Sequence, residues 1–158
     1  MELKLALCNT TGWAAAKSVL EVTDAGVVFL QEHRLLGDSL PAAQDWAAKA
    51  GWQVPAAGAL PGRRGKTCAG AAVAVRTYVG TRIFPGLKSG GAAPAPATLV
   101  RGRAAGVTAL TLAPGGIHLV SAYFKDGAGL RGENAQLMEQ LSEHLHDLEG
   151  PLDHRGRL

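Results

Sequence analysis

Three short apolar runs, each followed at once by polar side chains, constrain the fold of this 158-residue chain more than any other feature. The runs have the length of β-strands, and the first alternates leucine with other residues, as a strand with one buried face does. They cover residues 3–8, 25–30 and 117–122, and they are followed by Asn9, by Gln31 and Glu32, and by Tyr123, respectively. In an α/β domain, ligands bind outside the carboxyl ends of the strands, so these polar residues predict a functional site rather than a core.

The first two runs enclose a segment with the pattern of a helix. Strands are predicted over residues 2–9 and 25–31, and residues 10–22 between them are expected to form a helix capped by the threonines at its start. A strand, a helix and a strand in so few residues predict a βαβ unit with two neighbouring parallel strands. That arrangement would place Asn9 and Glu32 side by side.

The rest of the chain alternates ordered segments with loops rich in Gly, Ala and Pro. Helices are predicted over residues 40–50 and 133–148, a third strand over 70–75, and a hairpin whose strands, 107–112 and 117–123, flank a turn at 113–116. Residues 55–69 and 85–98 are predicted to be loops. These elements indicate an α/β fold, with one ordered domain over residues 1–148 and a flexible tail over 149–158.

The charge distribution favours a polyanionic partner. Residues 46–125 contain no Asp or Glu, whereas the two flanking segments hold all 13 acidic residues. The bases in this window are Lys49, Arg63, Arg64, Lys66, Arg76, Arg82, Lys88, Arg101, Arg103 and Lys125. Phosphate contacts dominate affinity for nucleic acids, so the window predicts nucleic-acid binding, with Arg63, Arg64 and Lys66 as candidate contacts. The alternative is that these bases only keep Gly- and Ala-rich loops in solution.

The cysteines and the lack of long apolar stretches predict an intracellular protein without a membrane partner. Cys8 and Cys68 lack the spacing of a metal site, and the first residues lack the features of a secretory signal. We therefore expect reduced thiols in an intracellular protein, without a distinction between nucleus and cytoplasm. No apolar stretch reaches the roughly 18 residues that span a membrane, so no membrane partner is expected.

Four short motifs occur in a particular order along the chain. They are Asn9 followed by Gly12-Trp13, Gln31-Glu32, Gly70 at the start of a strand of small residues, and Ala122-Tyr123 before a helix. In this order they resemble the amino-terminal half of the endonuclease/exonuclease/phosphatase superfamily of Mg²⁺-dependent phosphodiesterases. The superfamily includes apurinic-type endonucleases and the endonuclease domains of non-LTR retroelements, and His33 after Glu32 looks most like the retroelement type. The resemblance implies part of a four-layer α/β/β/α sandwich with a mixed sheet.

The resemblance also implies roles for three residues. Glu32 would bind the metal ion, Mg²⁺ or Mn²⁺, while Asn9 and Tyr123 would be catalytic residues that orient the phosphate and the metal-site groups. Mg²⁺ prefers oxygen ligands and usually takes only one or two carboxylates, which suits this set. Each residue also has a plainer interpretation. Asn9 would cap the following helix, Glu32 would be a solvated acid or a partner of Arg34, and Tyr123 would pack within the hairpin.

Later motifs of the superfamily are missing from this sequence. No Gly-Asp-Phe-Asn-like strand follows the last predicted helix, and Asp153-His154 lies too close behind that helix to replace the carboxy-terminal Asp-His pair. We therefore expect a truncated domain with weak hydrolysis or none when it acts alone. One sheet face would then lack its cover, which a missing second half-domain or an oligomer would supply.

Three functions are consistent with these observations. The first is a Mg²⁺-dependent phosphodiester hydrolase, an endonuclease with DNA as substrate. The second is a non-catalytic nucleic-acid-binding remnant that uses the basic segment over residues 46–125. The third keeps the family but changes the substrate to a small phosphoester. Loss of turnover in a Glu32→Ala variant would favour an enzyme, whereas binding that depends on the bases and ignores Glu32 would favour a binding module.

Overall fold

The computed structural model describes residues 2–84 and 96–155. Within these ranges the chain is a mixed α/β protein with three α-helices and several sheets. It divides into two compact units, Met1–Tyr123 and Phe124–Leu158. No helix of the described residues combines the length and the apolar character that crossing a membrane requires.

The first unit holds two of the helices and all strands of the described residues. The helices are α1 (Trp13–Val22) and α2 (Ser39–Lys49), with the 3-10 turns η1 (Arg63–Gly65) and η2 (Thr77–Val79). The strands are β1 (Leu5–Asn9), β2 (Val27–Gln31), β3 (Trp52–Gln53), β4 (Ala56–Ala57), β5 (Leu60–Pro61), β6 (Thr67–Cys68), β7 (Ala71–Arg76), β8 (Thr81–Ile83), β9 (Thr98–Val100), β10 (Ala104–Ala109) and β11 (Ile117–Ala122). The second unit holds α3 (Glu133–Arg155).

The predicted βαβ unit is confirmed. Strands β1 and β2 pair in parallel on either side of α1 in the sequence, with Asn9 opposite Gln31 at their carboxyl ends. The next strand in the sheet, β7, runs antiparallel to β2 and also pairs with β3 and β4. This first sheet is therefore mixed, and its two parallel strands end at the same edge.

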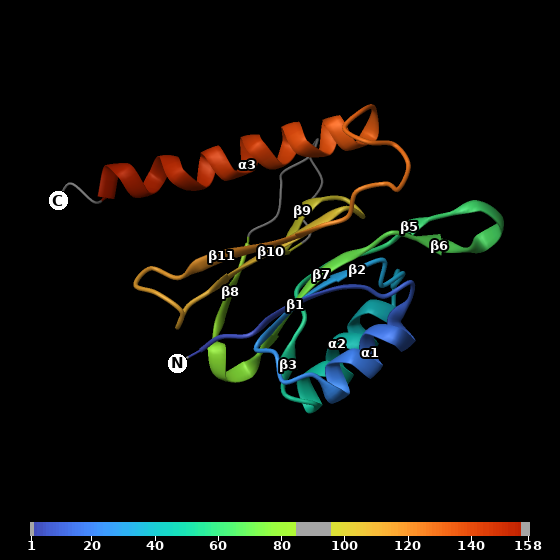
Figure 1. The fold of residues 1–158 in the computed structure, drawn as a ribbon, viewed down its shortest axis with the longest axis horizontal. Coiled ribbons are helices and arrows are strands. Elements are labelled where there is room, and N and C mark those ends of the chain that lie inside the picture. Colours follow the sequence, from blue (N-terminus) through green and yellow to red (C-terminus); the bar gives the residue numbers. More distant parts are fainter. Residues whose placement is uncertain (1, 85–95, 156–158) are drawn as a thin grey trace. The chain divides into compact units, whose positions relative to one another are not determined.

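Helices α1 and α2 cover one face of the first sheet (Figure 1). Small and aliphatic side chains fill the contact, because the Ala-rich helices can approach the sheet closely. Trp52 is the largest fully buried side chain there, and its indole N–H donates to the carbonyl of Leu20 at 3.2 Å. The cluster includes Ala16, Leu20, Val28, Leu30, Ala47, Trp52, Ala72 and Ala74.

A second sheet packs against the other face of the first. Its strand order in the described residues is β11-β10-β8, and β9 pairs with β10. Valines dominate the core between the two sheets, as expected of strands buried on both faces. The members of this core are Val27, Val73, Val75, Val79, Val107, Ala109 and Leu119. Within the first unit the layers therefore run helices, sheet, sheet (Figure 1).

The predicted hairpin forms, but its first strand is displaced. Strands β10 and β11 pair antiparallel, and the pair nearest the turn joins Ala109 to Ile117. The first strand therefore ends at Ala109 and not at residue 112, where it was predicted to end. The reason lies in the backbone after β10, where the N–H groups of Leu110 and Thr111 donate to carbonyls near η2. Those N–H groups are therefore lost to the hairpin ladder. Tyr123 follows β11 directly, and its N–H donates to the carbonyl of Arg103 across the hairpin at 2.7 Å, so its interpretation as a residue that packs within the hairpin is not contradicted.

The predicted start of the first helix is also corrected. Helix α1 has Gly12 at its N-cap position, without a capping side chain. Thr10 instead bonds across to Gln31, and the N–H of Thr11 donates to Oδ1 of Asn9 at 3.3 Å. Asn9 therefore organises the turn before the helix and does not cap it.

The segment over residues 55–69 was expected to be a loop, and this expectation is wrong. It contains the short strands β4, β5 and β6 around η1. Two-residue strands are too short for a periodic pattern to reveal them. Most of the other expected loop, 85–98, lies outside the described residues, and its last residue begins β9.

Strands β1 and β11 each form the edge of a sheet among the described residues. On β1, the side chains of Leu5 and Leu7 are 57% and 68% exposed. An unpaired strand edge presents open N–H and C=O groups for pairing with another chain. The predicted cover of one sheet face by a second half-domain or by an oligomer stays a prediction.

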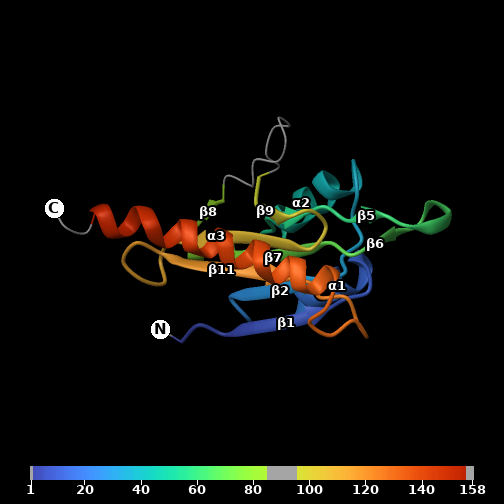
Figure 2. The ribbon, with the colours of Figure 1, turned by 90° about the horizontal axis from the view of Figure 1, so that it is seen from above.

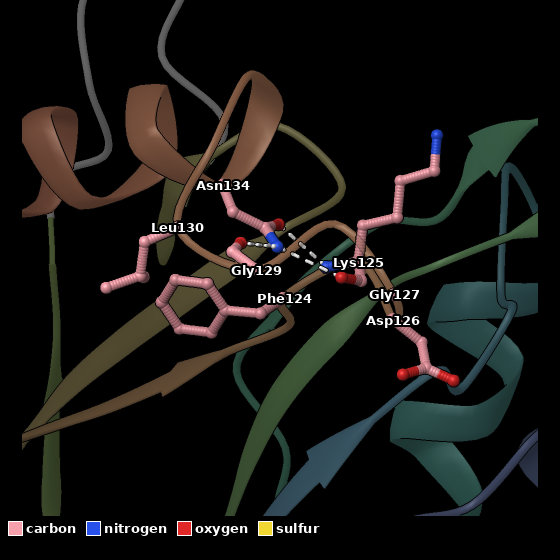
Figure 3. Close-up of a pocket in the computed structure, with 7 residues that line it drawn as sticks. All are labelled: Phe124, Lys125, Asp126, Gly127, Gly129, Leu130 and Asn134. Atoms are coloured by element: carbon pink, nitrogen blue, oxygen red, sulfur yellow. Dashed lines mark hydrogen bonds between the residues drawn. The ribbon is translucent and has the colours of Figure 1, made fainter.

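The second unit consists of a loop and a long helix. The helix predicted over 133–148 is confirmed, and its end lies further along the chain, at Arg155. Buried Asn134 fixes the loop before it, since its amide donates to the carbonyls of Lys125 and Gly129 and accepts the N–H of Lys125 (Figure 3). The side chain of Asp126 points away from this amide (Figure 3). This loop and Asn134 line a pocket of about 380 Å³, and both hydrogens of the Asn134 amide are already used in hydrogen bonds.

Candidate functional site

Four chain segments meet at the carboxyl ends of β2 and β11, where main-chain hydrogen bonds join them. We call them the site frame, and they are residues 31–32, 70, 102–103 and 122–123. The N–H of Glu32 donates to the carbonyl of Gly70 at 2.8 Å, and the N–H of Gly70 donates to the carbonyl of Gly102 at 2.9 Å. These two bonds fix the segment after β2 to the segments that precede β7 and β10.

Two further bonds close the site frame. The N–H of Tyr123 donates to the carbonyl of Arg103 at 2.7 Å. The side-chain amide of Gln31 donates to the carbonyl of Ala122 at 2.9 Å and so links the ends of the two sheets. Gln31 therefore has a structural role that its position at the end of an apolar strand did not reveal. The closed set of bonds holds Glu32, Arg103 and Tyr123 on neighbouring segments.

Asn9 lies beside the site frame. It is the register partner of Gln31, and the next residue, Thr10, bonds to the Gln31 carbonyl through its N–H at 2.9 Å and its hydroxyl at 3.1 Å. The side chain of Asn9 is exposed. The prediction that Asn9 and Glu32 come from adjacent parallel strand ends is therefore confirmed at the level of the backbone.

Glu32 follows directly after β2 in an uncommon backbone conformation. Its φ is +58°, in the left-handed region that non-glycine residues seldom adopt, and Arg34 has φ +59°. Such strain persists only where the surroundings fix the backbone, and it is concentrated at functional sites. In the described part of the chain Glu32 and Arg34 form no ion pair with one another, so the interpretation of Glu32 as a partner of Arg34 is not supported.

His33 holds the loop that carries Glu32. Its ring is buried, with Nε2 3.0 Å from the carbonyl of Ala57 and Nδ1 accepting the N–H of Leu35 at 3.0 Å. These partners fix the neutral tautomer with the proton on Nε2, because the Leu35 N–H requires an acceptor. Gly70 leaves the space for this ring, since a Cβ there would lie 2.6 Å from His33 Cε1. His33 is therefore a structural residue behind the candidate site.

The stability of the fold is expected to fall on acidification because of His33. Burial lowers the pKa of His33 below its ordinary value, and this effect outweighs the hydrogen bonds that raise it. The unfolded chain therefore takes up a proton near pH 6.5 while the folded chain resists it, so stability is full above that pH and declines below it. We predict a loss of at most about 1.4 kcal/mol per pH unit between pH 6.5 and 5, measured by urea unfolding. A His33→Gln variant should lose less between these pH values, and an equal loss in both proteins would contradict this account.

Tyr123 and Arg103 form a pair on the site frame. The Arg103 guanidinium carbon lies 5.3 Å from the centre of the Tyr123 ring, and Nη1 lies 3.5 Å from the Tyr123 carbonyl. Both side chains are half-buried. Arg103 was not singled out by the sequence as a site residue. Its position opposite the tyrosine follows from the register of β10 and β11, which a sequence alone leaves open by several residues.

The basic residues Arg63, Arg64 and Lys66 lie on the hairpin of β5 and β6, which we call the basic arm. All three side chains are exposed, and in the described residues none of them forms an ion pair. The arm extends from the sheets in both views (Figures 1 and 2). Its base is attached to the segment behind Glu32, since the hydroxyl of Thr67 donates to the carbonyl of Arg34 at 2.8 Å. The arm therefore starts next to the site frame.

The donor set at the site frame is sparse. Among the described residues, no group of three or more His, Cys, Asp or Glu side chains gathers to hold a metal ion. Glu32 is the single acidic residue in the four segments of the frame. A hard cation there would thus be bound by one carboxylate, by the oxygen of Asn9 and by water. Mg²⁺ accepts such a set, because it retains several waters and often uses one or two carboxylates.

Comparisons with known proteins do not assign this chain to a family. Neither protein-family models, nor curated proteins, nor solved structures give a match. The resemblance to the endonuclease/exonuclease/phosphatase superfamily therefore depends on the four sequence motifs. The structure adds where these motifs lie, because Asn9, Glu32, Gly70 and Tyr123 all belong to the site frame or adjoin it.

Proposed function

We propose that this chain is a Mg²⁺-dependent phosphodiesterase domain of the endonuclease/exonuclease/phosphatase type that acts on DNA. The observation that supports the proposal is the convergence of three predicted site residues. Asn9 ends β1, whereas Glu32 and Tyr123 directly follow β2 and β11, and the pairing of β1 with β2 and the bond from Gln31 to Ala122 bring those strand ends together. In this proposal the layers of the first unit belong to a four-layer α/β/β/α sandwich.

The roles of the residues follow from their chemistry. The carboxylate of Glu32 and the amide oxygen of Asn9 would bind Mg²⁺, or Mn²⁺ in its place. When bound, the ion would polarise a phosphoryl oxygen and neutralise the charge that develops on the leaving oxygen. The phenol of Tyr123 would donate a hydrogen bond to a phosphate oxygen. The bonds of the site frame would keep these groups in place before the substrate arrives, which lowers the cost of ordering them.

We expect slow turnover. A phosphodiesterase needs a group that positions or deprotonates the attacking water. His33, the histidine next to Glu32, is buried and uses both ring nitrogens in hydrogen bonds. The four segments of the site frame offer no second carboxylate for this role. Hydrolysis would therefore depend on how Asn9 and Tyr123 position the phosphate and on the charge stabilisation that an ion held by Glu32 would supply.

Plasmid nicking tests this proposal. Supercoiled DNA is incubated with the purified chain, with and without Mg²⁺, beside the Glu32→Gln variant and an exposed control on α1, Glu21→Gln. We expect Mg²⁺-dependent nicking that falls at least about tenfold in Glu32→Gln, because the metal loses its carboxylate, and that is retained in Glu21→Gln. Nicking that is equal in all three proteins, or no nicking above a mock preparation, would contradict the proposed activity.

A second candidate function is nucleic-acid binding without catalysis, and the basic arm favours it. Three exposed bases lie on one hairpin, inside a segment of the sequence that contains no acid. Replacing Arg63, Arg64 and Lys66 by alanine should weaken binding to any DNA sequence and reduce the salt dependence, because each phosphate contact releases counterions. If this triple variant loses binding while Glu32→Gln changes neither binding nor the DNA, the binding module is favoured over the enzyme.

A further inference from the structure

We propose that Arg103 is the phosphate-binding residue of this site, held in place by Tyr123. The substrate class, a phosphodiester, rests on the proposed function. The position of the arginine rests on its backbone contacts and on the ring beneath it. In this assignment the guanidinium binds the non-bridging oxygens of the phosphate, and Tyr123 serves both as its platform and as a neighbouring hydrogen-bond donor.

The backbone that carries Arg103 is fixed from three sides. Its N–H donates to the carbonyl of Val100 at 2.9 Å, and its carbonyl accepts the N–H of Tyr123 at 2.7 Å. The preceding residue, Gly102, has φ +69°, and a Cβ there would lie 2.3 Å from Leu60. This close approach packs the turn between β9 and β10 against the strand β5. The turn is therefore not a free surface loop.

The guanidinium itself is held by two contacts with Tyr123. It lies over the ring, with 5.3 Å between the guanidinium carbon and the ring centre, and Nη1 is 3.5 Å from the Tyr123 carbonyl. A guanidinium carries five N–H donors in a planar fork that matches two phosphate oxygens. Holding the fork in advance reduces the conformational entropy lost when the phosphate binds. A half-buried position also strengthens the attraction for an anion relative to a fully exposed one.

The charge of the surrounding sequence agrees with an anionic ligand. Arg103 lies in the window over residues 46–125 that contains no acidic residue, and Glu32 is the single acid of the site frame. The proposed cation would offset the charge of Glu32. The frame would then present one metal ion and one guanidinium to the same phosphate, from the segments after β2 and before β10.

Binding of a short oligonucleotide without metal tests this assignment. Fluorescence anisotropy is measured for a labelled oligothymidylate in EDTA with the full chain, Arg103→Ala, Arg103→Lys and Arg101→Ala. Arg101 lies in the same turn and is exposed, so Arg101→Ala removes the same charge without the contacts to Tyr123. We expect Arg103→Ala to weaken binding by about tenfold, Arg103→Lys to give an intermediate loss, and Arg101→Ala to change binding by less than about twofold.

Three outcomes would overturn the assignment. These are equal losses in Arg103→Ala and Arg101→Ala, full binding in Arg103→Ala, and no measurable binding by the unchanged chain. Thermal unfolding of each variant separates loss of the fold from loss of the contact, and Arg103→Lys keeps the test valid if the alanine variant is unstable. Because the titration contains EDTA, its result does not depend on the metal. A chain that nicks DNA through Glu32 but binds equally well without Arg103 would lose this assignment and keep the proposed function.

Discussion

Replacing Gly70 by alanine is expected to lower the free energy of unfolding by about 3 kcal/mol. The Cβ of the new residue would lie 2.6 Å from Cε1 of His33 and 2.8 Å from both ring nitrogens. Overpacking of this kind costs about 1–3 kcal/mol, and the φ of +94° at Gly70 adds about 1 kcal/mol for a residue with a Cβ. The ring cannot shift easily, because hydrogen bonds to Ala57 and Leu35 hold it.

A matched glycine separates the two causes. Gly51 has a similar φ, +87°, and a Cβ there would meet nothing within 4 Å. Gly51→Ala should therefore cost only the backbone strain, about 1 kcal/mol. Urea unfolding of the two variants and the unchanged chain measures the difference. Equal losses at Gly70 and Gly51 would show that the contact with His33 contributes nothing, and would contradict the role of His33 behind the Glu32 loop.

Replacing Glu32 by glutamine is expected to reduce the affinity for Mg²⁺ at least about tenfold. The site frame has one carboxylate, and losing its charge removes the strongest electrostatic attraction for a divalent cation. Glutamine keeps the shape of the side chain and one hydrogen-bonding oxygen. The backbone strain of the positive φ at this position is therefore the same in both proteins, and only the charge differs. Calorimetric titration with Mg²⁺ and with Mn²⁺ measures the loss. The control Glu21→Gln should bind as the unchanged chain does.

The opposite result is as informative. If Glu32→Gln and the unchanged chain bind Mg²⁺ equally, the cation is held elsewhere, and the proposed role of Glu32 is wrong. If neither protein binds Mg²⁺ while the basic arm still binds DNA, the chain is a binding module.

The sequence predicted the parts of the fold that depend on periodicity. The alternation before Asn9 and the apolar run before Gln31 predicted two parallel strands, and these strands pair in parallel with Asn9 opposite Gln31 at their ends. The helix patterns over 40–50 and 133–148 correspond to α2 and to the first part of α3. Long segments with one buried face can be predicted from the sequence, because the periodic spacing of their apolar residues is repeated at many positions.

The elements that escaped prediction lack such a repeat. The strands β4, β5 and β6 have two residues each, and they form because neighbouring segments supply the hydrogen-bond partners. Strand β10 ends earlier than predicted because the backbone after Ala109 forms hydrogen bonds to the segment near η2, more than 25 residues earlier in the chain. Tertiary contacts of this kind override local preference, and no local pattern reveals them.

The sequence identified several residues of the candidate site by their type, but it predicted only part of the site's geometry. Polar residues at strand ends identified Asn9, Glu32 and Tyr123, and the pairing of the strands brings their backbones to one edge. The bonds of the site frame, the buried ring of His33 and the position of Arg103 could not be predicted, because each depends on contacts between segments distant in sequence.

Anomalous scattering from crystals grown with Mn²⁺ would show whether Glu32 binds the metal, because it locates the ion without relying on activity. We expect one anomalous peak within coordination distance of the Glu32 carboxylate, beside Asn9, and its loss in crystals of Glu32→Gln. A peak at another carboxylate, or no peak at Glu32 at a saturating Mn²⁺ concentration, would contradict the assignment of a metal-dependent phosphodiesterase site to this edge of the sheets.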